Sequence, residues 1–248
     1  MTENRIFFKN NPYPLGHVIK EFVWSGHLDD QGQLWFDLHL KTDSYYAENP
    51  THFSEKEPIE AEQDLDDWHS KIVWGNYHAC TMSSTFWGSS GILIDATQPK
   101  LNFTNWLNTR LTADTLPPGA LNSNPVMPAD LEWDDWALNI YLLGHDACAN
   151  HQIDIAKNGA TFNVAWIGKI ALAYVGQDEF KYDFSANIAD VKFDGFEYPQ
   201  SFSQAKALAN FARYIQNIND FEFVDLKLKS QNDLTSLHEY KLALKNKA

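Results

Sequence analysis

Apolar side chains occupy every second position from Leu34 to Leu40 in the segment 34–42, LWFDLHLKT, and alternate with Trp35, Asp37, His39 and Lys41. Successive side chains of a strand point to opposite faces of a sheet, whereas a helix would scatter these apolar residues around its circumference. The preceding segment 17–28, HVIKEFVWSGHL, is separated from this run by the Gly-containing connection DDQGQ. Together the two segments predict a β-hairpin with one buried face. In the second strand this face is formed by Leu34, Phe36, Leu38 and Leu40.

Short runs with the character of strands continue along the chain. They lie at residues 71–82, 91–97, 136–144, 152–156, 161–176, 180–188, 190–198 and 221–229. The sequence KNG at 157–159 is typical of a tight turn between two of them. We therefore predict an α+β protein built mainly on an antiparallel β-sheet.

One amphipathic helix is predicted near the C-terminus, at residues 202–217. Ser201 and Gln204 have the spacing of a capping box. Apolar residues then recur at helical intervals and should form the buried stripe. They are Leu208, Phe211, Ala212 and Ile215. The basic C-terminal segment 234–248 is a further candidate for a helix.

The segment 114–130, DTLPPGALNSNPVMPAD, contains four prolines and lacks a continuous apolar pattern. Such a segment is typical of a connection between structural units. It predicts a β-rich N-terminal lobe at 1–113 and a β-rich C-terminal lobe, which carries the helix, at 131–248. The alternative is a single domain that spans residues 1–248.

The composition predicts a packed, soluble protein. The chain has 248 residues, of which 44% are hydrophobic, and it contains nine Trp, ten Tyr and sixteen Phe. Two cysteines are too few for a disulfide framework, and no apolar run approaches the roughly 18 residues of a membrane span. We therefore expect a cytoplasmic protein with reduced thiols.

Net charge is the strongest compositional signal. The chain carries 33 Asp and Glu against 19 Lys and Arg, a formal net charge of −14. Nucleic acids and anionic membranes bind through Lys and Arg, so both are poor candidates for partners. The segment 55–67, EKEPIEAEQDLDD, concentrates seven acidic residues beside a single lysine. It is expected to be a surface loop.

Two stretches, 66–80 and 134–148, resemble each other. Both begin Asp-Asp-Trp, place an Ile four residues after the Trp, and end Ala-Cys, which makes six identities in fifteen positions. A duplication would make Trp, Ile and Cys inward-facing anchors, and the Pro-rich segment would mark its junction. Free Cys commonly behaves as a small buried hydrophobe, which suits this interpretation. Chance similarity is the alternative.

A zinc site is a weaker interpretation of the same region. His145, Cys148 and His151 lie close together in GHDACANH, and His78 with Cys80 would be second donors. Zinc prefers imidazole and thiolate ligands, but the sequence has neither Cys-x2-Cys nor His-Glu-x-x-His. We therefore expect no metal or other cofactor.

Sequence patterns that would indicate a catalytic site are weaker than the pattern that suggests zinc. Cys80 near His78 would need a base and an orienting group to act as a nucleophile. The acid pairs Asp66/Asp67 and Asp134/Asp135 are adjacent in sequence, so in a strand their side chains would face opposite ways. The sequence shows no phosphate-binding loop and no Gly-x-Ser-x-Gly nucleophile elbow. No catalytic residue is predicted, and an enzyme is the less favoured interpretation.

The favoured function is therefore binding of a basic partner protein through acidic and aromatic surface. Focused negative potential accelerates encounter with a cationic protein, and Trp can anchor the contact. The predicted contact residues are Glu55, Glu57, Glu60, Glu62, Asp64, Asp66, Asp67 and Trp68. In size, acidity and expected compartment the chain is similar to bacterial immunity proteins that neutralise nuclease-type toxins, although no motif of those proteins occurs in it. The alternative is a small-molecule enzyme or ligand-binding protein with a pocket between β-rich lobes.

Overall fold

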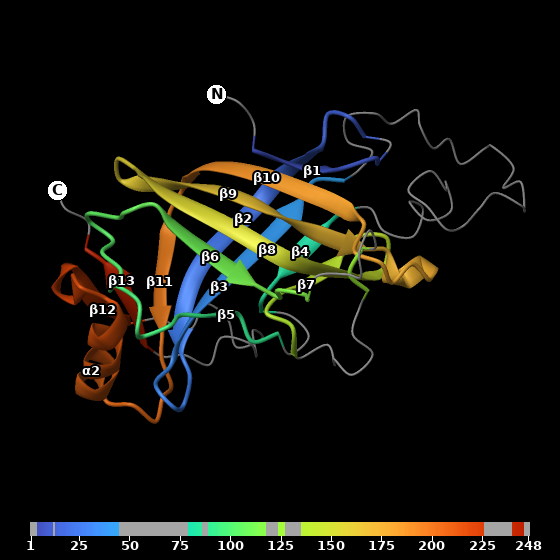
Figure 1. Ribbon diagram of the computed structural model, residues 1–248. Helices are drawn as coiled ribbons and strands as arrows, with labels where there is room; N and C mark the ends of the chain where they lie inside the picture. The colour runs from blue at the N-terminus through green and yellow to red at the C-terminus, as the bar shows by residue number, and fades with distance from the viewer. Residues whose placement is uncertain are drawn as a thin grey trace, which may run out of the picture.

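The computed structural model describes residues 4–11, 13–44, 79–85, 89–117, 124–126, 135–225 and 240–245. Thirteen strands of these parts join in one sheet (Figure 1). They are β1 (Arg5–Phe8), β2 (His17–Leu28), β3 (Leu34–Thr42), β4 (Thr81–Ser83), β5 (Ile92–Leu93), β6 (Thr109–Ala113), β7 (Asn139–Tyr141), β8 (His145–Asn158), β9 (Thr161–Ala171), β10 (Tyr182–Val191), β11 (Phe193–Glu197), β12 (Phe221–Asp225) and β13 (Tyr240–Leu244). The described helices are α2 (Gln204–Tyr214) and the short 3-10 helices η2 (Ala173–Val175) and η3 (Ile218–Asp220).

The sheet closes on itself. Pairing runs from β2 through β1, β10, β9, β8, β7, β4 and β3, and β3 then pairs back onto β2. Every pairing around this closed ring of eight strands is antiparallel. Figure 1 shows the two layers that result, with β8, β9 and β10 crossing in front of β2 and β3. The predicted antiparallel architecture is confirmed, and the described chain is mainly β with one α-helix.

Two local predictions are confirmed in detail. β2 and β3 form the predicted hairpin, with Leu28 opposite Leu34 at its closed end. All four apolar residues of the alternating run are fully buried: Leu34, Phe36, Leu38 and Leu40. The KNG sequence joins β8 to β9, and its Gly159 has a φ of +59°, in the left-handed region that glycine tolerates best.

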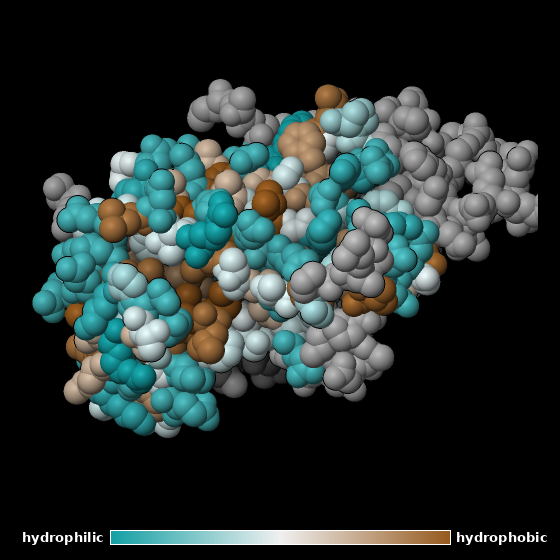
Figure 2. All heavy atoms as spheres, viewed as in Figure 1, coloured by the Kyte–Doolittle hydropathy of each residue, from teal (hydrophilic) through white to brown (hydrophobic). Residues whose placement is uncertain are grey.

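Aromatic rings fill the inside of the closed ring. Trp24 is fully buried, and its ring centroid lies 4.8 Å from that of Phe193, 5.0 Å from that of Phe162 and 5.5 Å from that of Trp106. Such contacts are edge-to-face arrangements that aromatic rings favour. The interior is therefore a packed core, and the clefts considered below lie on the outer surface. Figure 2 shows that hydrophilic residues cover most of that surface in this view, with apolar residues visible between α2 and β6.

The predicted helix is present as α2, with two corrections. Ser203, not Ser201, caps it, because the Ser203 side chain accepts a hydrogen bond from the Lys206 backbone N–H. The residues before it remain in a turn that buries Phe202. Phe211 and Ile215 of the predicted stripe are buried, whereas Leu208 and Ala212 are half-buried. Ala207 and Tyr214 complete the buried face instead.

Strands from both sides of the Pro-rich segment 114–130 pair with each other. β1 pairs with β10, β2 with β11, β4 with β7 and β6 with β8. The two proposed lobes therefore share one sheet. A helix in the C-terminal segment is wrong for residues 240–244, which form β13 between β11 and β12 and bury Leu242 completely. Within the described residues, no helix is long and apolar enough to cross a membrane.

Candidate functional site

A cleft of about 410 Å³ opens on the outer side of the β2–β3 hairpin. We call it the His27 cleft. It is lined by His27, Asp29, Trp35, Asp37, Ser84, Thr85, Ser89, Ser90 and Glu197. Three of these residues are acidic, four carry hydroxyl groups, and none is Lys or Arg.

The alternation of β3 places the cleft's central side chains. Because Phe36 and Leu38 point into the core, Trp35 and Asp37 point outward. His27 lies directly opposite Trp35 on β2, and the two rings stack with centroids 6.4 Å apart. The pattern that fills the core therefore also builds the cleft wall.

His27 and Asp37 form a close pair. Nδ1 of His27 donates to Oδ2 of Asp37 at 2.6 Å, while Ser84 Oγ donates to the other carboxylate oxygen at 3.2 Å. Burial on its own would lower the pKa of His27. The hydrogen bond to Asp37 and the negative charges of Asp37, Glu197 and Asp29 outweigh burial, and the pKa of His27 is raised above its ordinary value.

Asp29 fixes the other end of the cleft. Its Oδ2 accepts a hydrogen bond from the Trp35 indole Nε1 at 3.0 Å. Its Oδ1 accepts from the backbone N–H groups of Gln31 and Gln33, at 2.9 and 2.8 Å. One carboxylate therefore holds both the hairpin connection and the indole. The result is an acidic recess with an aromatic wall, which is suited to hold a cation.

Neither scans against protein-family models nor searches of curated proteins and solved structures found a match.

The predicted acidic contact residues, Glu55, Glu57, Glu60, Glu62, Asp64, Asp66, Asp67 and Trp68, lie outside the described residues. The structure thus brings together a different acidic set from the one that the sequence singled out. The hairpin was predicted, but its register was not, and the contact between His27 and Asp37 depends on that register. One signal was available: Asp is depleted in strands, yet Asp37 stands in the middle of a strongly alternating run.

The second Asp-Asp-Trp stretch has the predicted inward anchors. Trp136, Ile140 and Cys148 are all buried. In the first stretch Cys80 is buried as well, while Trp68 lies outside the described residues. Both thiols are free and buried, as predicted. Burial raises the pKa of Cys80 and of Cys148, so neither thiol has the thiolate character of a nucleophile.

The three residues of the zinc hypothesis have separate environments. His145 is exposed, with its Nε2 2.9 Å from the Tyr141 hydroxyl, whereas Cys148 Sγ donates to the Leu138 carbonyl. His151 is buried and accepts a hydrogen bond from Trp166 Nε1 at 3.2 Å. In the part of the chain that the structure describes, no three His, Cys, Asp or Glu side chains are grouped as metal ligands. His78 lies outside that part.

Proposed function

We propose that the protein binds a basic partner protein and that the His27 cleft receives a lysine or arginine side chain of that partner. One observation carries the proposal: Asp29, Asp37 and Glu197 converge beside the Trp35 indole, and among the described residues that line the cleft His27 is the only basic one. The acidity of the whole chain supports the same kind of partner, since its formal net charge is −14.

The wall of the cleft is fixed before a ligand arrives. Trp35 is held from one side by the hydrogen bond to Asp29 and from the other by its stack on His27. A guanidinium or ammonium group that packs against an indole gains about 0.5–2 kcal/mol, depending on its exposure to water. A wall that needs no rearrangement retains more of this energy on binding.

Inhibition of a basic toxin or enzyme is the form of binding that we expect. Long-range attraction would bring the partners together, and a basic side chain in the cleft would fix their orientation. The association rate should then fall as salt rises, because charges are screened beyond about 8–10 Å at physiological ionic strength.

The test uses a matched pair of small ligands. Acetyl-arginine methylamide carries the charged group, and acetyl-citrulline methylamide has nearly the same shape without the charge. Each is titrated into ¹⁵N-labelled protein, and the Trp35 indole N–H resonance, assigned with Trp35→Phe, is followed by NMR. We expect a saturable shift with the arginine compound only. Glu197→Gln should weaken its binding roughly two- to fivefold.

Glu222→Gln is the matched control, because Glu222 is exposed on β12 and does not line the cleft. It should leave the titration unchanged. Equal shifts with both ligands, or no shift of the Trp35 resonance, would overturn the proposal.

A second candidate is catalysis by His27 as a general base. The 2.6 Å bond to Asp37 orients the imidazole, and Nε2 has no hydrogen-bond partner among the described residues. Histidines oriented in this way accept protons from water or hydroxyl groups during hydrolysis. The test measures hydrolysis of p-nitrophenyl acetate by wild type and by two variants. Activity that is lost in His27→Gln and retained in His145→Gln would favour this candidate. Equal background rates in both variants would exclude it for activated esters.

A further inference from the structure

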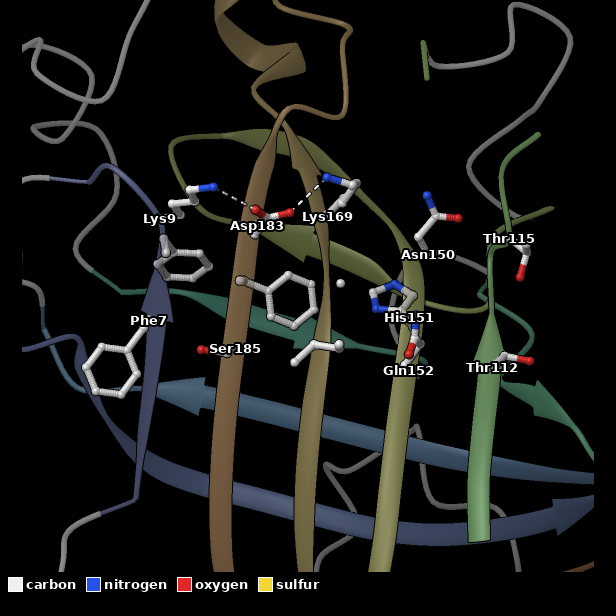
Figure 3. A pocket seen from close by; sticks show the side chains of 14 residues that line it. Phe7, Lys9, Thr112, Thr115, Asn150, His151, Gln152, Lys169, Asp183 and Ser185 are labelled. Atoms are coloured by element: carbon white, nitrogen blue, oxygen red, sulfur yellow. Dashed lines mark hydrogen bonds and ion pairs between the residues drawn. The ribbon is translucent and has the colours of Figure 1, made fainter. Parts of the chain in front are cut away.

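A second and larger cleft, of about 740 Å³, lies on the outer face of β1, β10, β9 and β8 (Figure 3). None of its lining residues belongs to the His27 cleft. We call it the Phe7 groove. Its volume falls in the range of about 300–1,000 Å³ that is usual for sites of small organic ligands.

The pairing of neighbouring strands sets the order of the outward-facing side chains that form the central row of the groove. Phe7 pairs with Ser185 and Ser185 with Ile167, so one short side chain separates two large apolar ones. Phe7 is 39% exposed and Ile167 47% exposed, and both are among the few large hydrophobic residues that face solvent. The row continues across the sheet through Gln152 and Thr112, which supply an amide and a hydroxyl.

The backbone of Gly168 forms part of the floor, and the core packs directly beneath it. Gly168 lies next to Ile167, and the buried ring of Phe184 packs against its backbone. A Cβ atom at position 168 would lie 2.6 Å from this ring, so only glycine leaves room for it. A bulge in β8 at Asn150, whose φ is +52°, interrupts the register on the far side of the groove.

One end of the groove is positively charged. Lys9 Nζ lies 3.3 Å and Lys169 Nζ 2.8 Å from the two oxygens of Asp183. Figure 3 shows the two lysines reaching this carboxylate from either side, above the row that contains Phe7 and Ser185. Two ammonium groups share one carboxylate, which leaves a local excess of one positive charge. His151 adds none at neutral pH, because burial lowers its pKa to about 3.

We propose that the Phe7 groove binds a small amphipathic anion. Its flat apolar body would lie between Phe7 and Ile167 over the short side chain of Ser185, and its negative group would meet Lys9 and Lys169. Charge complementarity points to an anion, since a net positive site in a chain of net charge −14 repels the cations that the rest of the surface attracts. The exposed apolar pair points to an organic body rather than to an inorganic ion.

The test compares two dyes with the same aromatic frame. 1-Anilinonaphthalene-8-sulfonate carries a sulfonate, and N-phenyl-1-naphthylamine lacks it. We expect saturable binding of the sulfonate at a single site, with backbone NMR shifts confined to the strands that line the groove, which are β1, β6, β8, β9 and β10. The Lys9→Gln/Lys169→Gln variant should weaken the sulfonate about tenfold, because it removes both positive charges from the end of the groove, and should leave the neutral dye unchanged.

Phe7→Ser/Ile167→Ser should weaken both dyes by a similar factor. Leu107→Ser is the matched control, because Leu107 is 83% exposed and lies outside the groove, and it should weaken neither. Thermal unfolding checks that each variant is folded. The proposal would be overturned if the lysine variant bound the sulfonate as tightly as wild type, or if Leu107→Ser lost as much dye affinity as Phe7→Ser/Ile167→Ser. NMR shifts on other strands, or no saturable binding below about 1 mM, would also overturn it.

Discussion

The imidazole of His27 and the indole of Trp35 stand opposite each other on β2 and β3, with their planes within 9° of parallel. Asp37 accepts a hydrogen bond from the imidazole at 2.6 Å, and Asp29 accepts one from the indole at 3.0 Å. The wall of the cleft is thus a unit of two rings and two carboxylates. A change in one carboxylate should therefore be measurable at the ring that it binds.

Asp37→Asn should lower the pKa of His27. In the native protein the pKa is raised by the hydrogen bond and charge of Asp37 and by the charges of Glu197 and Asp29, against the opposing effect of burial, so removing Asp37 takes away two of the causes that raise it. An NMR titration of the His27 ring protons measures the change. A group whose pKa is higher in the folded protein than in the unfolded chain stabilises the fold. This stabilisation is complete at pH values below the pKa in the unfolded chain, and it is lost as pH rises through the pKa in the folded protein. The stability advantage of wild type over Asp37→Asn should therefore shrink from pH 6 to pH 8. Asp95→Asn, on an exposed turn, is the control.

Asp114→Asn should become more stable relative to wild type as pH rises from 4 to 7. Burial raises the pKa of Asp114 to about 6, so the folded protein holds this proton more tightly than the unfolded chain. Ionisation between pH 4 and pH 6 therefore destabilises wild type, by about 3 kcal/mol if the unfolded pKa is near 3.9. Urea unfolding at both pH values measures the difference. A constant difference across this range would show that Asp114 ionises normally.

Phe211→Ala should destabilise the fold by about 3–5 kcal/mol, the usual effect of removing a fully enclosed phenyl ring. Phe211 is fully buried, and its ring centroid lies 5.0 Å from that of Phe196. Leu107→Ala, at an exposed position, should change the free energy of unfolding by less than about 0.5 kcal/mol. Urea denaturation of both variants tests the pair. Similar small effects would mean that α2 contributes little to the core.

The acidic segment 55–67 stays a prediction about partner recognition. Replacing Glu55, Glu57, Glu60 and Glu62 with Gln should slow association of a polybasic peptide and leave thermal stability nearly unchanged, because exposed like charges mainly affect long-range attraction. Trp68→Ala should mainly speed dissociation. Stopped-flow binding at several salt concentrations separates the two effects. An unchanged association rate in the Gln variant at every salt concentration would exclude this segment from recognition.

Local patterns predicted local structure well. The β2–β3 hairpin depends on neighbouring residues, so the alternation around Phe36 and Leu38 was sufficient to predict it. The helix α2 was found for the same reason, although its cap was assigned two residues too early. Ser201 and Ser203 are both acceptable caps by composition, and Ser203 is the one whose side chain accepts from the Lys206 backbone N–H.

Distant pairings could not be predicted in this way. β1 pairs with β10 at a separation of about 180 residues, and β13 joins the sheet beside β11. Nothing near Tyr240–Leu244 distinguishes a strand from a helix until its partners are known. The Phe7 groove follows from such pairings, because Phe7 and Ile167 are 160 residues apart and meet only through β10.

The closure of the ring limits how this protein can be recognised. Each of its eight strands has a neighbour on both sides, so the main-chain hydrogen-bonding groups of these strands are largely occupied. A partner cannot extend such strands by adding one of its own, which is a common mode of peptide capture and of aggregation through exposed edges. Specificity for ligands of the ring must come from the side chains that project from it. Variation at outward positions can therefore change the partner while the inward positions, and the fold, stay the same.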